Sequence, residues 1–291
     1  MTNIIGHAKI LNFLHRSVAR NTVSQAYLFW GPENVGKFSL ALEFSKELTG
    51  GDDSKINPNL VVVEPESSEV KGVVKKQDIK VGEIRELQKK ISLTPNLGKH
   101  NVAIINDAER LTKSAQNSLL KTLEEPPRNS VIILVASDKS KLLPTVLSRC
   151  QMIKFSSLSD GEIEKILPPE TKNKEKIIFW SMGRPGLAKR MVENRDELKL
   201  REESMRDIDL AISARVYEKF YLAEALSKNV PLTLEKLDWW VALLRKDMLE
   251  DKNPKKSGEL ESIEKINASK EVIKNTNANV RLVLENLFLS F

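Results

Sequence analysis

The segment Ala26-Tyr27-Leu28-Phe29-Trp30-Gly31-Pro32-Glu33-Asn34-Val35-Gly36-Lys37-Phe38 decides the fold. Its first five residues form a continuous apolar run of strand length, and the next seven fit the pattern G-x-x-x-x-G-K. Between a strand and a helix, this pattern predicts a phosphate-binding loop. We expect backbone N–H groups around Gly31 and Gly36 to close on phosphate oxygens, and Lys37 to reach toward the β and γ phosphates of a nucleotide.

Further apolar runs of strand length follow before residue 160. They are continuous rather than alternating, which is typical of strands buried on both faces, and they lie at 60–63, 102–105, 131–136 and, more weakly, 152–155. Helical patterns lie between them, at about 38–48, 81–91 and 113–123. Strands that alternate with helices predict an α/β domain with a parallel, doubly wound sheet, in which chemistry gathers at the carboxyl ends of the strands.

Beyond residue 157 the strand patterns stop and helical patterns continue to the end of the chain. We therefore expect an α/β domain at 1–157, a small helical region at 158–204 and an all-α domain at 205–291. Apolar residues recur at helical spacing near the end of the chain, namely Leu260, Ile263, Ile266, Val280, Val283, Leu284 and Leu287. This apolar surface is expected to be buried within one helical bundle or against another subunit.

Composition narrows the class of protein. No apolar run among the 291 residues approaches the roughly 18 to 20 that span a bilayer, and the first ten residues do not resemble a signal peptide, so we expect a cytoplasmic protein without a membrane segment. A single cysteine, Cys150, excludes an internal disulfide and is expected to be a small buried side chain. The net charge of +6 is compatible with nucleic-acid contact. The lysine-rich stretch 70–76 could make such a contact or form a solvated loop or hairpin.

Two positions that should support a magnesium ion carry unsuitable side chains. A hydroxyl should follow the lysine of the loop, but Phe38 stands there, and a phenyl ring cannot coordinate a hard cation. The run 102–105 should end in an acidic pair, but Asn106 lacks the charge and Asp107 is shorter than a glutamate. Without metal charge, stabilisation of a phosphoryl-transfer transition state should largely fail. The sequence therefore predicts a chain that does not hydrolyse ATP by itself, while weak binding of ATP or ADP through Gly36 and Lys37 stays open.

Two longer motifs carry a resemblance to a known family. The stretches 106–112 (NDAERLT) and 116–127 (QNSLLKTLEEPP), and the stretch 142–151 (LLPTVLSRCQ) with its Ser-Arg-Cys signature, resemble the AAA+ subunits of bacterial DNA polymerase III clamp loaders. With the phosphate loop, these motifs cover about residues 1–155, and the tail 277–285 is similar to the end of the helical collar of delta-prime subunits. The resemblance implies an AAA+ domain, a helical lid at 158–204 and a collar at 205–291, in a delta-prime-type subunit.

The family resemblance also implies roles for three side chains. Arg149 of the Ser-Arg-Cys signature is expected to act in trans as an arginine finger in the nucleotide site of an adjacent motor subunit; the alternative is an ordinary surface ion pair. Ser137 lies where the family places a polar sensor of the γ-phosphate, and Arg184 lies near the second sensor of the lid. For these two residues a purely structural role is an equal alternative.

The partners that the resemblance implies are the gamma/tau motor subunits and the clamp-opening delta subunit in a hetero-pentamer, the sliding clamp and primer-template DNA. Many relatives carry a four-cysteine zinc module, but residues 48–58 contain no cysteine, so neither zinc nor any required cofactor is expected. Two other functions stay open. One is an active gamma/tau-type ATPase that holds magnesium through waters; the other is a basic DNA-binding protein that works outside a loader and binds DNA with steep salt dependence.

Overall fold

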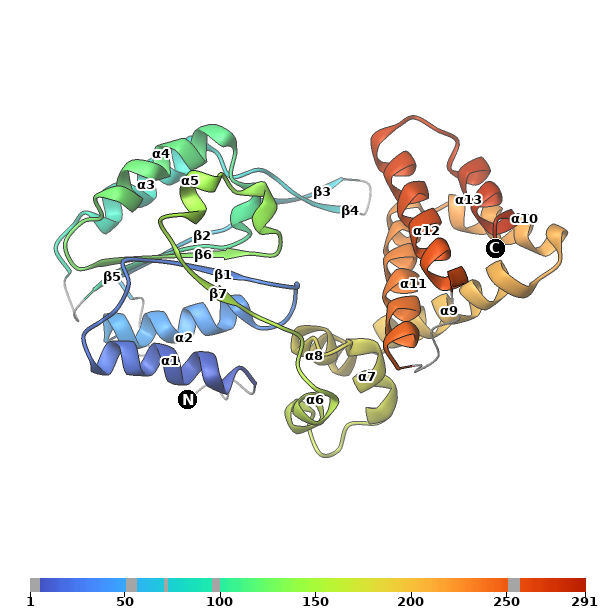
Figure 1. The fold of residues 1–291 in the computed structure, drawn as a ribbon, viewed down its shortest axis with the longest axis horizontal. Coiled ribbons are helices and arrows are strands. Elements are labelled where there is room, and N and C mark those ends of the chain that lie inside the picture. The colour runs from blue at the N-terminus through green and yellow to red at the C-terminus, as the bar shows by residue number, and fades with distance from the viewer. Residues whose placement is uncertain (1–5, 51–56, 71–72, 96–99, 251–256) are drawn as a thin grey trace. The chain divides into compact units, whose positions relative to one another are not determined.

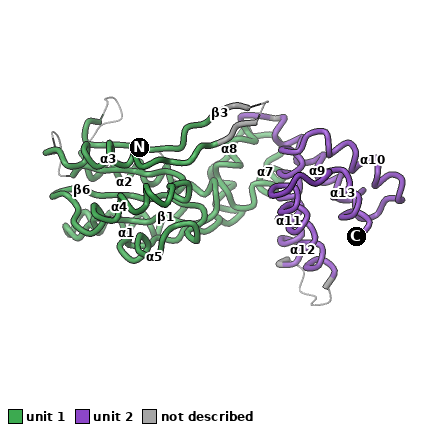
Figure 2. The backbone as a smooth tube through the Cα atoms, turned by 90° about the horizontal axis from the view of Figure 1, so that it is seen from above, with its two compact units in different colours: residues 1–192 green, residues 193–291 purple. Residues whose placement is uncertain are grey.

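The structure is a computed structural model that describes residues 6–50, 57–70, 73–95, 100–250 and 257–291 (Figure 1). The chain divides into two compact units, residues 1–192 and 193–291 (Figure 2). The expected lid helices up to residue 192 thus group with the sheet in the first unit. The finer division into a lid at 158–204 and a collar from 205 stays a prediction.

A five-stranded parallel sheet forms the centre of the first unit. Its strand order is β2-β5-β6-β1-β7, with β1 (Ala26–Trp30), β2 (Leu60–Val63), β5 (Asn101–Ile105), β6 (Ser130–Ala136) and β7 (Gln151–Lys154). β1 pairs along its whole length with β6 in the centre of the sheet, from Ala26 opposite Ile132 to Trp30 opposite Ala136. The predicted parallel α/β fold is therefore confirmed, and the four strongest apolar runs coincide with strands to within one residue.

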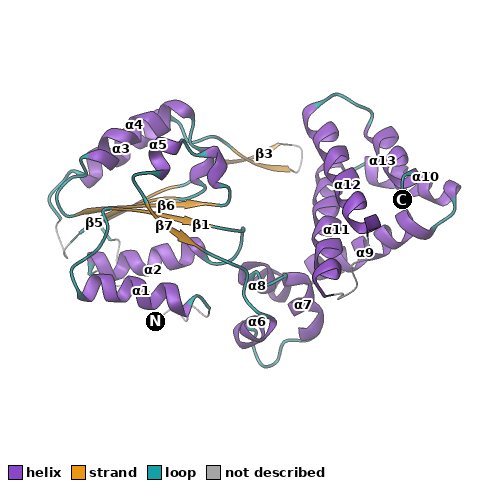
Figure 3. Ribbon diagram, in the orientation of Figure 1, coloured by secondary structure: helices purple, strands orange, loops and turns teal. Residues whose placement is uncertain are grey.

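Helices cover both faces of this sheet (Figures 1 and 3). α1 (Ala8–Ala19) and α2 (Lys37–Thr49) lie on one face, and α3 (Val81–Ile91), α4 (Lys113–Glu124) and the short α5 (Pro144–Leu147) lie on the other. α3 shows why this sequence forms a covering helix, since its buried side chains recur three and four residues apart and are Ile84, Leu87 and Ile91. Each face thus has its own apolar core, and both cores position the carboxyl ends of the strands.

A β-hairpin follows β2, where the lysine-rich stretch left a choice between a loop and a hairpin. β3 (Ser67–Val70) and β4 (Val73–Lys76) pair antiparallel with Ser67 opposite Lys76. The hairpin is confirmed, and residues 71–72 at its turn lie outside the described residues. Its last residue, Lys76, brings a cation back toward the end of β5. Two short 3-10 helices follow strands of the sheet, η1 (Ala108–Arg110) after β5 and η2 (Lys139–Lys141) after β6.

Three helices follow β7, namely α6 (Asp160–Ile166), α7 (Lys174–Ser181) and α8 (Pro185–Glu193). The turn between α7 and α8 requires glycine at 183. Gly183 has a φ of 72°, and a Cβ there would lie 2.3 Å from the carbonyl oxygen of Leu158. The backbone N–H of Leu158 donates to the carbonyl of Gly183 at 2.8 Å, so the turn is fastened to the segment that leaves the sheet.

The second unit is all helical, as predicted, with α9 (Arg195–Ser213), α10 (Val216–Ser227), α11 (Val230–Glu250), α12 (Ser257–Asn275) and α13 (Val280–Leu289). Trp240 is fully buried, and its indole N–H donates to the carbonyl and the hydroxyl of Ser204 at 2.8 and 2.9 Å. Most of the apolar stripe predicted near the end of the chain is buried within this unit, including Ile263, Ile266, Leu284 and Leu287, whereas Leu260 is half exposed.

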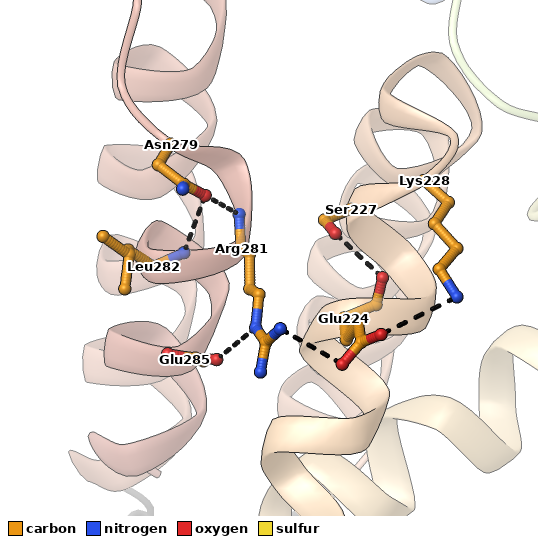
Figure 4. A network of polar contacts seen from close by, with 7 residues as sticks. All are labelled: Glu224, Ser227, Lys228, Asn279, Arg281, Leu282 and Glu285. Carbon is orange, nitrogen blue, oxygen red and sulfur yellow. Dashed lines mark hydrogen bonds and ion pairs between the residues drawn. The ribbon is translucent and has the colours of Figure 1, made fainter.

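A polar network joins α10 to α13 on the surface of this unit (Figure 4). Arg281 contacts Glu224 of α10 at 3.1 Å and Glu285 of its own helix at 2.7 Å. The side chain of Asn279 caps α13 by accepting from the backbone N–H groups of Arg281 and Leu282. None of the described helices is both long and apolar enough to cross a membrane.

Candidate functional site

The phosphate loop connects β1 to α2 at the carboxyl edge of the sheet. Gly31 has a φ of 147°, and a Cβ there would lie 2.2 Å from the carbonyl oxygen of Phe155, so only glycine fits where the loop leaves β1. Gly36 has a φ of 95° and precedes the first turn of α2 as its N-cap. The predicted loop is therefore present with the glycines in the required places, and the N-terminus of α2 lies at its end.

Lys37 is folded back onto the loop. Its ammonium group donates to the carbonyls of Gly31 and Pro32, both at 2.6 Å, and the residue is only 6% exposed. Burial lowers the pKa of Lys37 because it penalises the charged form. The neighbouring charges act on this pKa in both directions: Glu109 most strongly, then Glu33 and Asp107, raise it, and Arg184 lowers it.

The two positions expected to support magnesium are engaged elsewhere. Phe38 packs against the apolar core on the α1 and α2 face of the sheet. The side-chain amide of Asn106 donates to a carboxylate oxygen of Glu64, beyond the end of β2, at 2.8 Å. Each side chain thus has a structural partner of its own, and neither offers an anionic oxygen to a cation.

Asp107 is held by the hairpin. Its carboxylate is paired with the ammonium group of Lys76, the last residue of β4, and Arg110 donates to the backbone carbonyl of Lys76 at 2.9 Å. Asp107 has a φ of 50°, the left-handed region that aspartate tolerates better than most residues. The one carboxylate left of the expected acidic pair is therefore already paired with a cation of the same chain.

Glu109 is the site residue that the sequence analysis missed. One carboxylate oxygen accepts from the backbone N–H of Ser137 at 3.1 Å, and the other is buried without a hydrogen-bond partner among the described residues. Glu109 stands two positions after Asp107, on η1, and its carboxylate is bonded to the residue that follows β6, whereas that of Asp107 is paired with the hairpin. A second acid in the segment N-D-A-E was the available signal, but nothing in the sequence indicated which of the two carboxylates would turn inward.

Ser137 and Arg184 also lie at this edge of the sheet. Ser137 directly follows β6 and contributes its backbone N–H to Glu109. Arg184 begins the turn into α8, where the backbone N–H of Gly186 donates to the carbonyl of Asn34 in the phosphate loop at 2.9 Å. The Nε atom of Arg184 is buried, and it has no hydrogen-bond partner among the described residues. The structure thus brings Lys37, Asp107, Ser137 and Arg184 together at one edge of the sheet. The roles of Ser137 and Arg184 as sensors stay predictions.

Arg149 lies apart from this group, on the surface formed by α4 and α5. Its guanidinium contacts the carboxylate of Glu124 at 2.5 Å and donates to the carbonyl of Thr145 at 2.8 Å. Next to it, Cys150 packs against the apolar core, and burial raises the pKa of its thiol to about 12. Arg149 is therefore available on the outside of the molecule and is not placed to act on the chain's own phosphate loop.

The side chains present fit a phosphate group better than they fit magnesium. Lys37, Arg184 and the N-terminus of α2 are suitable partners for an anion. Phe38 and Asn106 cannot supply the charged oxygens of a metal site, and no group of three or more His, Cys, Asp or Glu in the described ranges could hold a metal ion. Residues 51–56, within the stretch where relatives carry a zinc module, lie outside the described residues, so the expectation of no zinc stays a prediction.

Comparison with known proteins identifies the family. A family model described as "DNA polymerase III, delta subunit" matches residues 6–159. Similar proteins include the DNA polymerase III subunit delta' of Bacillus subtilis, 32% identical over 54% of this chain and 49% of that protein, and the delta' subunit of Pseudomonas aeruginosa, 30% identical over 58% and 56%. The subunit tau of Bacillus subtilis is 30% identical over 58% of this chain and 32% of that protein. The alignments therefore span about half or less of these relatives.

Solved structures support the fold. A gamma subunit-related protein of DNA polymerase III from Thermotoga maritima matches with a TM-score of 0.52 and 18% identity, over 95% of this chain and 97% of that one. The Holliday junction branch migration motor RuvB of Thermotoga maritima matches with a TM-score of 0.50 and 16% identity, over 96% and 87%. The fold is thus that of AAA+ proteins. Since the family model covers more than half of the chain, the protein belongs to the DNA polymerase III, delta subunit family of clamp-loader subunits.

Proposed function

We propose that the chain is a delta-prime-type subunit of a DNA polymerase III clamp loader that does not hydrolyse ATP itself and supplies Arg149 to the nucleotide site of a neighbour. The observation that carries this proposal is the state of the phosphate-loop site. Phe38 is packed into the core, Asn106 is bonded to Glu64, and Asp107 is paired with Lys76. The chain's own site therefore lacks the charges that phosphoryl transfer needs.

Arg149 supports the second half of the proposal. It lies on the surface, after α5, and its guanidinium is oriented by Glu124 and Thr145 rather than free to move. A guanidinium that reaches a γ-phosphate neutralises charge in the transition state, and such arginine fingers accelerate hydrolysis by roughly 10³- to 10⁵-fold. In the proposed complex the neighbours are gamma/tau motor subunits and a delta subunit, and the complex places a sliding clamp on primer-template DNA.

Reconstitution tests both halves of this proposal. The purified chain alone should show no ATP turnover above that of a Lys37→Ala variant. Added to motor and clamp-opening subunits with primed DNA and clamp, it should stimulate ATP hydrolysis, and Arg149→Ala should assemble equally well but stimulate far less. Size-exclusion chromatography of the mixtures checks assembly. Arg128→Ala, which removes a different arginine from the segment after α4, is the matched control.

The outcomes separate the candidate functions. Steady turnover by the isolated wild-type chain, lost in Lys37→Ala, would instead identify a gamma/tau-type ATPase, whose relatives are as similar in sequence as some delta' subunits. Equal stimulation by wild type and Arg149→Ala would refute the role of Arg149. Tight, strongly salt-dependent DNA binding by the chain alone, without assembly, would favour a DNA-binding protein that works outside a loader.

A further inference from the structure

The ends of three adjacent strands place one carboxylate beside the phosphate loop. At the end of β1, the backbone N–H of Gly31 donates to the carbonyl of Ala136, the last residue of β6, at 3.3 Å. The next residue on that side, Ser137, donates its backbone N–H to Glu109 at 3.1 Å. The carboxylate of Glu109 is therefore fixed where the loop begins, at the same edge as the ammonium group of Lys37.

The other acids near Lys37 differ from Glu109 in their surroundings. Glu33 is exposed to water, and Asp107 is neutralised by its ion pair with Lys76. Glu109 has one carboxylate oxygen sealed from solvent with no hydrogen-bond partner among the described residues. Its negative charge is therefore poorly screened by water, and it acts on the ammonium group of Lys37 more strongly than the other acids do.

We infer that Glu109 is the built-in counter-anion of the phosphate loop and opposes the binding of phosphate-bearing ligands, a nucleoside triphosphate more strongly than a diphosphate. An anion that enters the loop must come close to a carboxylate with one buried oxygen, and like charges in a partly desolvated site repel each other. Because a triphosphate carries more negative charge than a diphosphate, the penalty rises with the length of the phosphate chain. This inference rests on the proposed non-hydrolysing site but not on the role of Arg149.

A competing role for the same carboxylate is that of a substitute metal ligand. Magnesium demands several oxygen ligands in octahedral geometry, and a single carboxylate does not replace the lost hydroxyl and acidic pair. Glu109 also accepts a backbone hydrogen bond, and its neighbours Asn106 and Asp107 are bonded to Glu64 and Lys76. The surroundings thus favour repulsion of a phosphate over support of a cation, and the two roles predict opposite effects of removing the charge.

The test is a binding measurement without turnover. Fluorescent N-methylanthraniloyl ADP and ATP are titrated with the full chain, with EDTA and then with magnesium, using wild type, Glu109→Gln, Glu109→Ala and the double variant Glu109→Gln with Lys37→Ala. Glu109→Gln keeps an oxygen for the N–H of Ser137 and removes the charge. Glu86→Gln, which removes an exposed carboxylate from α3, is the matched control. Circular dichroism and thermal unfolding verify that each variant is folded.

We expect both single variants at position 109 to bind the two nucleotides about tenfold more tightly than wild type, with the larger gain for the triphosphate. The double variant lacks the ammonium group of Lys37 and should bind both nucleotides more weakly than the Glu109→Gln single variant. The control Glu86→Gln should have the affinity of wild type. Affinities of the single variants within twofold of wild type would overturn the inference. Magnesium-enhanced binding in wild type that Glu109→Gln abolishes would also overturn it and identify Glu109 as a metal ligand.

Wild type alone provides a second test that depends on no substitution. Without metal, it should bind the diphosphate more tightly than the triphosphate; the reverse order would contradict the inference. The proposed function fails if the isolated wild-type chain turns over ATP. The titrations report nucleotide affinity alone, so the two failures are distinguishable.

Discussion

The guanidinium of Arg149 lies 2.5 Å from the carboxylate of Glu124, which is the last residue of α4. A second guanidinium nitrogen donates to the carbonyl of Thr145 at 2.8 Å. The arginine is thus oriented by two elements of its own subunit, although about a third of its side chain stays exposed. A planar guanidinium held at two of its nitrogens still has further N–H groups to offer to a phosphate.

This ion pair should contribute little to folding. Exposed and half-exposed ion pairs stabilise proteins by about 0 to 1 kcal/mol, so Arg149→Ala and Glu124→Gln should each lower the free energy of unfolding by less than about 1 kcal/mol. Urea unfolding followed by circular dichroism measures the change. A loss of several kcal/mol in either variant would show that the pair is structural, and reduced ATP turnover in a loader could then reflect a damaged subunit.

Lysine should not replace the arginine. Arg149→Lys keeps the positive charge but cannot donate at once to Glu124, Thr145 and a phosphate from one planar group. In the reconstituted loader we expect the ATP turnover of Arg149→Lys to lie closer to that of Arg149→Ala than to that of wild type. Glu124→Gln keeps the arginine and should retain more activity than either. Wild-type turnover in Arg149→Lys would show that charge alone is sufficient.

Sequence periodicity was enough to predict the sheet, because its strands read as continuous apolar runs and the inner ones, β5, β6 and β1, are buried on both faces, whereas the edge strands β2 and β7 are partly exposed. The runs at 26–30 and 60–63 coincide with strands residue for residue, and 152–155 is shifted by one. α1 was not predicted, although its buried residues include Leu14. The apolar residues of this helix are spaced among polar ones, so they give a weaker signal than the continuous runs of the strands.

The site was predictable in part. The loop glycines, Lys37 and the unsuitable Phe38 follow from a local motif, so the sequence suffices for them. The partners of Asn106 and Asp107 are Glu64 and Lys76, more than thirty residues away in sequence, and Glu109 accepts from the backbone N–H of Ser137 beyond β6. Such relationships depend on tertiary contacts that a local motif does not encode.

The side chain of Phe38 should be needed for stability. It packs against the apolar core between the sheet and α1 and α2 while remaining partly exposed. We expect Phe38→Ser, which restores the hydroxyl of an active loop, to lower the free energy of unfolding by roughly 1 to 3 kcal/mol, less than for a fully buried phenylalanine. Chemical unfolding measures the loss. The same variant should gain no magnesium-dependent ATP turnover, because Asn106 and Asp107 are unchanged; a gain would place the catalytic defect at residue 38 alone.

In the helical unit, the cap of α13 should matter more than the neighbouring ion pairs (Figure 4). Asn279 accepts from two backbone N–H groups that have no other partner within the first turn, so Asn279→Ala should lower the free energy of unfolding by about 1 kcal/mol. Arg281→Ala removes solvent-exposed contacts to Glu224 and Glu285 and should cost less. Thermal unfolding of the two variants compares them directly, and a larger loss for Arg281→Ala would reverse the expected order.

The pH dependence of stability should report the environment of Lys37. Because burial lowers its pKa in the folded chain, the unfolded chain binds more protons between that lowered pKa and the ordinary lysine value of about 10.4. The free energy of unfolding therefore rises with pH through this window, because the unfolded chain loses its extra proton and folding no longer has to bury a charged ammonium group. Urea unfolding at several pH values from about 8 to 10 should show wild type gaining stability relative to Lys37→Met.

Two comparisons make this pH measurement specific. Lys90→Met, which removes an exposed lysine from α3, controls for the loss of a positive charge as such. In Glu109→Gln the gain should begin at lower pH, since the carboxylate that raises the pKa of Lys37 most strongly is then absent. A stability difference between wild type and Lys37→Met that stays flat or falls with rising pH would show that Lys37 is charged at no cost in the folded chain, and the site would then be more open to water than its contacts with Gly31 and Pro32 imply.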